Sequence, residues 1–271
     1  MSVIETALSK LKRGGPRHST EPRSQQRRVK ITDHAAAIHH PTRQFLPATL
    51  DTVAMERNRI LPQVADQAAL RAYKILRTRL LQRLSANQWK SVAVTGTESG
   101  QGKTLTSINL SIALAQDPNT RVCLVDLDLQ RPQVAAQMGL GFELGLGEYL
   151  LGECDAQQII YESGIPHLVV IPNSRMFEHS SEMLAGARTL ELLQVIEAEM
   201  PQHIVIFDMP PLLLGDDVLT FAPQVDGLLL VVAEGMTQRT TAAKAKEVLA
   251  DMNLIGVVLN RSSERDNSAY Y

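Results

Sequence analysis

The sequence reads Gly96-Thr97-Glu98-Ser99-Gly100-Gln101-Gly102-Lys103-Thr104 between an apolar run, 91–94, and a helix-like segment, 105–115. A strand, a glycine-rich turn and a helix start, in this order, are typical of a phosphate-binding loop. Glycines at 100 and 102 let backbone N–H groups close around an oxyanion, and the helix N-terminus adds partial positive charge. One position departs from the G-x-x-x-x-G-K-[ST] pattern, because Thr97 stands where its first glycine is usual.

This loop predicts the residues that bind a nucleoside triphosphate. They are six consecutive residues: Ser99, Gly100, Gln101, Gly102, Lys103 and Thr104. The Lys103 ammonium suits the β- and γ-phosphates, and the Thr104 hydroxyl can ligate Mg²⁺. The alternative is a glycine-rich turn that merely exposes a lysine.

Acidic residues follow two further apolar runs. Run 121–125 ends in Asp126 and Asp128, and run 203–207 ends in Asp208. Because the carboxyl ends of parallel strands meet at one edge of a sheet, we expect all three carboxylates to face the same nucleotide. The pattern therefore predicts a Mg·ATP site, with the metal held by Thr104, Asp126 and Asp208 and with Asp208 also contacting the cofactor. Solvated turn residues that merely end strands are the alternative.

Length and charge bound the function. The chain has 271 residues, 44% of them hydrophobic, which is enough for one substantial core and a tail. A net charge of −2 argues against general nucleic-acid binding. Residues 1–45 nevertheless carry nine Lys and Arg against three acids, or +6, and leave −8 for the remainder. This basic extension is either a solvated, flexible tail or a contact with an anionic membrane or an acidic partner.

The sequence predicts a cytoplasmic location. No apolar run approaches the roughly 20 residues of a membrane span, and the N-terminus lacks the apolar stretch of a signal peptide. Cys123 and Cys154 have no ligand-type spacing, so both are interpreted as packing residues.

The order of the elements predicts an α/β fold with a doubly wound, mostly parallel sheet. Strands are expected at 91–95, 121–126, 167–171, 203–208, 226–233 and 255–259. Helices are expected at 1–12, 66–84, 103–116, 156–162, 181–199 and 237–251. We divide the chain into a flexible basic N-terminal extension with a short amphipathic helix (1–62), a P-loop domain (63–260) and a tyrosine-bearing tail (261–271). Residues 13–62 are rich in Arg, Ser, Gln, His and Pro without a period, which predicts a linker with little core of its own.

These motifs resemble those of the bacterial tyrosine kinases, the P-loop autokinases of capsule and exopolysaccharide biosynthesis. The resemblance rests on the loop at 96–104, on Leu-Val-Asp-Leu-Asp-Leu-Gln-Arg-Pro at 124–132 and on Ile-Phe-Asp-Met-Pro-Pro at 206–211, and it continues through Ile-Gly-Val-Val-Leu-Asn at 255–260. It covers the chain from about residue 68 to the C-terminus, and the first 13 residues are similar to the exosortase-associated subgroup.

The resemblance implies ATP- and Mg²⁺-dependent phosphorylation of tyrosines in a C-terminal tail, usually on a neighbouring subunit. Here the acceptors would be Tyr270 and Tyr271, and Lys103, Asp126 and Asp128 would be the catalytic residues. Either aspartate could accept the phenol proton. No membrane-anchored activator segment is recognised, so the implied partner is a separate membrane polysaccharide co-polymerase that presents a cytoplasmic segment.

A partitioning-type P-loop ATPase, acting as a nucleotide-gated assembly module without kinase activity, is the alternative. Such proteins usually carry an extra lysine near the start of the loop, where this chain has Glu98. The kinases usually have proline at the position of Ser99. Their first helix often bears Glu-x-x-Arg-x-x-Arg for ring contacts, and the corresponding residues here are Arg71, Lys74 and Arg77, so a ring held by that acid is not predicted. The alternative for these three residues is a solvated helix face, which is the more common role of charges at this spacing.

Overall fold

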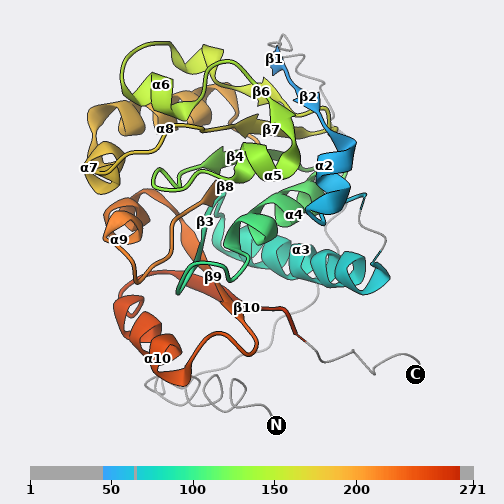
Figure 1. Ribbon diagram of the computed structural model, residues 1–271, viewed down its shortest axis with the longest axis vertical. Helices are drawn as coiled ribbons and strands as arrows, with labels where there is room; N and C mark the ends of the chain where they lie inside the picture. Colours follow the sequence, from blue (N-terminus) through green and yellow to red (C-terminus); the bar gives the residue numbers. More distant parts are fainter. Residues whose placement is uncertain (1–44, 64–65, 263–271) are drawn as a thin grey trace, which may run out of the picture. The chain divides into compact units, whose positions relative to one another are not determined.

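A central sheet of eight strands runs through the part of the chain that the computed structural model describes, residues 45–63 and 66–262 (Figure 1). Its strand order is β1-β6-β7-β4-β8-β3-β9-β10. The bounds are β1 Leu46–Pro47, β6 Tyr161–Glu162, β7 Leu168–Ile171, β4 Arg121–Asp126, β8 His203–Asp208, β3 Ser91–Gly96, β9 Gly227–Ala233 and β10 Leu254–Asn260. The inner strands are continuous apolar runs because helices cover both of their faces.

The six strands from β7 to β10 are parallel to one another, and β6 pairs antiparallel with β7. Strand β8 lies between β3 and β4, although β4 follows β3 in the sequence. The register pairs Asp126 with Asp208. The carboxyl ends of β3, β4 and β8 therefore meet at one edge, as the sequence predicted.

Helices form a layer on each face of this sheet (Figure 1). One layer holds α2 Thr52–Arg57, α3 Gln67–Asn87, α4 Lys103–Ala115 and α5 Val134–Met138. The other holds α6 Leu146–Leu150, α7 Ser180–Ala185, α8 Ala187–Glu199, α9 Asp217–Phe221 and α10 Arg239–Val248. Helix α4 is almost wholly buried, since it packs between the sheet and α3. The doubly wound, mostly parallel α/β fold is confirmed.

Two predicted helices differ from the structure. Residues 156–162 form a single 3₁₀ turn, Ala156–Gln158, and then β6, so the helix predicted there is wrong. The helix predicted at 181–199 is two helices, because Gly186 is extended, with φ −70° and ψ 156°. Helices α5, α6 and α9 are only five residues long, and so short a segment shows no periodic pattern.

Residues 13–62 were predicted to be a linker with little core of its own, and for the described residues 45–62 this prediction is wrong. Asp51 caps α2 by accepting hydrogen bonds from the N–H groups of the first turn. Met55, Ile60 and Leu61 are fully buried, and the Leu61 N–H donates to Asn109 Oδ1 of α4 at 2.8 Å. Strand β2, Thr49–Leu50, pairs with β5, Leu140–Gly141. Hence this segment closes one edge of the domain.

Both predicted termini, the amphipathic helix at 1–12 and the tail tyrosines, lie outside the described residues. Within the described part of the chain, no helix combines the length and apolarity that crossing a membrane requires.

His203 makes the stability of the fold pH-dependent. Burial at the start of β8, together with the charge of Arg121 on the paired strand, lowers the pKa of His203 from 6.5 to about 4. As pH falls below 6.5, His203 therefore becomes protonated in the unfolded chain but stays neutral in the folded chain. The free energy of unfolding decreases until pH reaches about 4, where the folded chain is protonated as well. After allowance for partial exposure, we expect wild type to lose about 1–2 kcal/mol more than His203→Leu between pH 7 and pH 5 in urea unfolding. Parallel losses in the two proteins would contradict this.

Candidate active site

The loop between β3 and α4 has the backbone shape of a phosphate cradle. Gly100 and Gly102 have φ of +79° and +87°, a left-handed region that favours glycine. A Cβ on Gly102 would also collide with the side-chain amide of Asn260. The loop leads directly into α4, so the N–H groups of its first turn point into the same space.

Gln101 braces this loop from within. The sequence predicted it as a nucleotide ligand, but its side chain is buried and turned back into the loop. Its Oε1 accepts from the N–H groups of Thr97 and Glu98 at 2.7 and 3.1 Å. Its Nε2 donates to Thr97 Oγ1 at 2.6 Å and to Thr237 Oγ1 at 2.8 Å. The unusual Thr97 therefore supplies an acceptor for Gln101, and only the backbone of Gln101 is left for a phosphate.

The end of β10 holds the loop from outside. Asn260 Nδ2 donates to the carbonyl of Gln101 at 2.9 Å, and Arg261 Nη2 donates to the carbonyl of Gly100 at 2.8 Å. Sequence reasoning missed Asn260 and Thr237 as supports of the loop. A polar residue that ends an apolar strand, as in Val-Val-Leu-Asn at 257–260, was the available signal.

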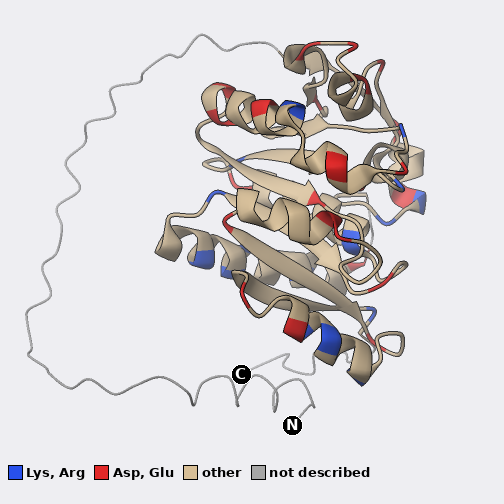
Figure 2. Ribbon diagram, turned by 90° about the vertical axis from the view of Figure 1, so that its left-hand side faces the viewer, with Lys and Arg blue, Asp and Glu red and all other residues tan. Residues whose placement is uncertain are grey.

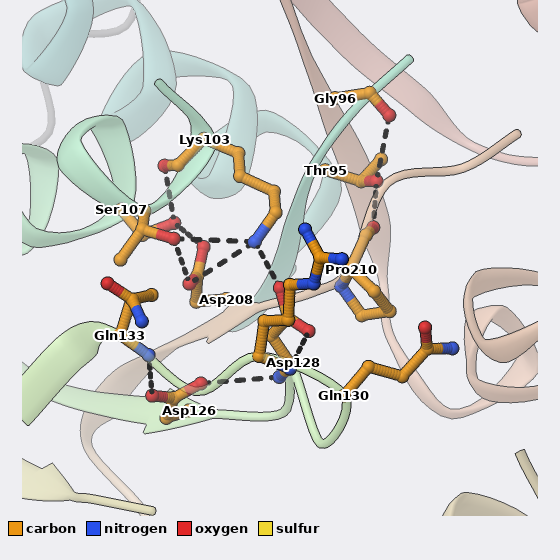
Figure 3. A network of polar contacts seen from close by, with 12 residues as sticks. Thr95, Gly96, Lys103, Ser107, Asp126, Asp128, Gln130, Gln133, Asp208 and Pro210 are labelled. Atoms are coloured by element: carbon orange, nitrogen blue, oxygen red, sulfur yellow. Dashed lines mark hydrogen bonds and ion pairs between the residues drawn. The ribbon is translucent and has the colours of Figure 1, made fainter. Parts of the chain in front are cut away.

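Lys103 lies among the predicted carboxylates (Figure 3). Its Nζ is 2.5 Å from Asp128 Oδ2 and 3.9 Å from Asp208 Oδ2. The other Asp128 oxygen accepts from the Arg131 N–H at 2.9 Å. The structure thus joins the loop lysine to residues that lie 25 and 105 positions later in the chain.

Asp208 is fully buried, and its carboxylate accepts hydrogen bonds from two hydroxyl groups of α4. Thr104 Oγ1 donates to its Oδ2 at 2.7 Å, and Ser107 Oγ donates to its Oδ1 at 2.8 Å. Ser107 was not predicted. Its position one turn beyond Thr104, on the same face of α4, was the signal.

Asp126 points toward the start of α5 rather than toward Lys103 (Figure 3). Its Oδ2 accepts from the N–H groups of Gln133 and Val134, each at 3.0 Å, and its Oδ1 accepts from the Asp128 N–H at 3.3 Å. The Asp126 carboxylate consequently fixes the segment between β4 and α5, including the backbone of Asp128.

The charges of the site are strongly coupled. Burial raises the pKa of Asp126 well above its ordinary value, the nearby Asp208 adds to the rise, and the Val134 hydrogen bond opposes it. Burial also raises the pKa of Asp208, against the lowering effects of Lys103, Thr104 and Ser107. For Lys103, burial lowers the pKa, but Asp208 and Asp128 outweigh it and raise the net value. The lysine is therefore a cation at neutral pH.

The donor set suits a magnesium ion that is shared with phosphate oxygens. Within residues 45–63 and 66–262, no group of three His, Cys, Asp or Glu side chains could hold a metal. Thr104 and Asp208 nevertheless present a hydroxyl and a carboxylate in direct contact. Mg²⁺ prefers oxygen ligands and keeps several waters, so these two ligands plus phosphate oxygens fit it.

Three further predicted site residues lie outside this network. Ser99 is exposed on the loop, and Tyr270 and Tyr271 lie outside the described residues.

Fold and site define a nucleotide-binding domain of the P-loop class. Residues 92–270 match the family described as CobQ/CobB/MinD/ParA nucleotide binding domain, to which the chain belongs. The septum site-determining protein MinD of Pyrococcus horikoshii, solved with Mg-ADP, superposes with a TM-score of 0.54 at 21% identity over 65% of this chain and 72% of that one, a likeness of fold alone.

Within this class the chain belongs to the bacterial tyrosine-protein kinases. It is 32% identical to the tyrosine-protein kinase YwqD of Bacillus subtilis over 218 residues, which cover 80% of this chain and 91% of that protein. The kinase domain of the Escherichia coli tyrosine kinase ETK superposes with a TM-score of 0.65 at 27% identity over 73% of this chain and 77% of that one. The resemblance found in the sequence is confirmed, and these relatives favour the kinase over the partitioning ATPase.

The role of Gln101 as a brace can be tested by Gln101→Leu. This change leaves two N–H groups and a hydroxyl of the loop without a partner, at a cost of about 1–3 kcal/mol. We expect the Kd for ADP, measured by calorimetry, to rise about tenfold or more. Glu98→Gln is the control, since Glu98 is exposed and its backbone N–H is unchanged. An unaltered Kd in Gln101→Leu would mean that the loop keeps its shape without the brace.

Proposed function

We propose that this chain is an ATP- and Mg²⁺-dependent tyrosine autokinase that transfers the γ-phosphoryl group of ATP to Tyr270 and Tyr271, usually of a neighbouring copy. The observation that carries the proposal is one polar network at the carboxyl edge of the sheet. In it Lys103 Nζ lies 2.5 Å from Asp128 and Thr104 Oγ1 lies 2.7 Å from Asp208. A loop amide cradle, a cation, a hydroxyl and two carboxylates are the groups that phosphoryl transfer needs.

Binding begins with the backbone of the loop. The N–H groups between Gly100 and Thr104 surround the phosphates, and the helix N-terminus favours their charge. When the triphosphate binds, the Lys103 ammonium moves away from Asp128 and pairs with the β- and γ-phosphate oxygens instead. Since the ammonium carries its charge throughout, this exchange needs no proton transfer.

Thr104 and Asp208 would hold the magnesium ion, with Ser107 fixing the second oxygen of Asp208. When bound, Mg²⁺ neutralises the negative charge that develops on the phosphate oxygens. Asp126, predicted as a third ligand, has hydrogen bonds to three backbone N–H groups. We therefore assign Asp126 to positioning Asp128.

Asp128 is the better placed base. Among residues 45–63 and 66–262, only Lys103 contacts its Oδ2, so the exchange of Lys103 onto phosphate frees that oxygen. The tyrosine oxygen then forms a bond to the γ-phosphorus while the bond to the β-phosphate oxygen breaks. ADP leaves, and the phenol proton passes to Asp128. A phenol with a pKa near 10 needs this acceptor at neutral pH.

The family also suggests where the kinase acts. We propose a role in exopolysaccharide or capsule synthesis, at the inner face of the cytoplasmic membrane, with a membrane polysaccharide co-polymerase as the activating partner. Support comes from the resemblance to the polysaccharide-associated autokinases.

Mass spectrometry of the full chain incubated with Mg·ATP tests the kinase assignment. We expect phosphotyrosine at positions 270 and 271 in wild type and none in Lys103→Met, which lacks the ammonium. In Tyr270→Phe/Tyr271→Phe we expect ATP binding without phosphotyrosine in the tail. ADP formation by wild type with no modified tyrosine would contradict the proposal and favour a nucleotide-gated module.

Mixing two variants separates the acceptor from the enzyme. Lys103→Met offers an intact tail, whereas Tyr270→Phe/Tyr271→Phe offers an intact site. Phosphotyrosine on the Lys103→Met chain in the mixture is the result expected for transfer between copies. If wild type is modified but the mixture is not, transfer occurs within one chain.

Asp128 and Asp126 can be distinguished by paired asparagine variants. Asp128→Asn removes the base, so we expect kcat to fall about 10²–10⁴-fold while the Kd for Mg·ATP stays similar or decreases. Asp126→Asn loses an acceptor for backbone N–H groups, so we expect a Tm decrease beyond that of Asp128→Asn. Rapid-quench kinetics and thermal unfolding measure the two effects. A larger kcat loss in Asp126→Asn, at unchanged Tm, would reverse the assignment.

A further inference from the structure

Helix α3 carries a concentration of positive charge that the proposed kinase chemistry does not use. Its 21 residues include five basic side chains and no acidic one: Arg71, Lys74, Arg77, Arg79 and Arg83. Residues 46–271 as a whole are acidic, at −8, whereas this helix carries +5. Figure 2 marks the Lys and Arg positions in blue and the acidic positions in red.

The inner face of α3 is already occupied. Leu80 and Leu84 are buried against the domain, and Arg77 donates to the Ala113 carbonyl of α4 at 3.2 Å. This packing fixes the orientation of the helix. Its opposite face is therefore presented to the outside as a rigid surface.

The outer face carries a shallow hollow between Arg71, Lys74, Ile75, Thr78 and Arg79, and its lining is mostly apolar side-chain surface. At 100° per residue, its three cations fall within an arc of about 140°. Among the described residues, none of these three forms an ion pair. Arg71 and Lys74 are like charges at i,i+3, which costs helix stability unless an anion lies nearby.

The composition of this hollow favours a flat anionic surface over a protein partner. Protein interfaces are usually held by buried aromatic or aliphatic anchors in pockets, whereas Ile75, a residue that is 40% exposed, is the one apolar residue among the five that line this hollow. Exposed cations on one face of a helix instead match the charge of an anionic lipid bilayer, where each cation near the surface adds to the attraction. The long Lys and Arg stems can also spread to reach lipid phosphates.

We propose that the outer face of α3 is a docking surface for anionic phospholipid, and that it holds the domain at the membrane by electrostatic adsorption without insertion. The proposal is independent of the kinase chemistry, because none of Arg71, Lys74 and Arg79 lies in the P-loop network. Binding should weaken as salt screens the charges.

Cosedimentation of the full chain with vesicles tests this surface. The vesicles contain phosphatidylcholine with phosphatidylglycerol, and phosphatidylcholine alone is the control. The test variant is Arg71→Gln/Lys74→Gln/Arg79→Gln. Its matched control is Arg239→Gln/Lys244→Gln/Lys246→Gln on α10, which removes three exposed cations and changes the net charge equally. The N-terminal extension is identical in all three proteins.

We expect wild type to bind only the anionic vesicles, less strongly as salt is added. The α3 variant should bind about 100-fold more weakly, while the α10 variant stays within a few-fold of wild type. Equal weakening of the two variants, undiminished binding of the α3 variant, or no binding of wild type would each overturn the proposal. So would an α3 variant whose mass by light scattering changes without a change in vesicle binding, since a second copy would then occupy the face. Should the triple variant prove unstable, Arg71→Gln alone, expected to bind about fivefold more weakly, carries the same test.

Discussion

The site depends on a lysine ammonium held next to buried carboxylates. Lys103 is the residue that we propose contacts the phosphates, and Asp208 and Asp128 raise its pKa despite its burial. A buried cation is costly without such partners, and buried carboxylates are equally costly without the cation. The lysine and the carboxylates therefore stabilise each other in the buried site. An incoming triphosphate can substitute for Asp128, because its oxygens present the same charge and geometry to the ammonium.

The sheet brings these groups together. Strand β8 lies between β3 and β4, so the loop after β3 and the acidic residues at the ends of β4 and β8 share one edge. Helix α4 adds Thr104 and Ser107 to the same edge because it starts in the loop. Two supports then keep the loop in shape: Gln101 from within and the end of β10 from outside. The nucleotide site is thus a consequence of strand order, and the loop sequence refines it.

Much of this arrangement could be predicted from the sequence, and the failures have physical causes. Long apolar runs located the central strands, and an acidic residue after such a run located the edge of the site. Position along a strand does not determine where a side chain points, so the sequence could not show that Asp126, a predicted metal ligand, accepts hydrogen bonds from the backbone N–H groups of Gln133 and Val134. For the same reason the sequence could not show that the Gln101 side chain turns back into the loop and leaves only its backbone for a nucleotide. Segment 46–61 was missed because its apolar residues are few and lack a regular period.

The exchange of Lys103 from Asp128 to phosphate is the central claim, and a crystal structure with Mg²⁺ and a non-hydrolysable ATP analogue tests it most directly. The account predicts Lys103 Nζ within hydrogen-bonding distance of the β- and γ-phosphate oxygens, the Asp128 carboxylate free of the lysine, and Thr104 and Asp208 at the ion. A bound nucleotide with Lys103 still paired to Asp128, and with no contact from its Nζ to phosphate, would contradict it.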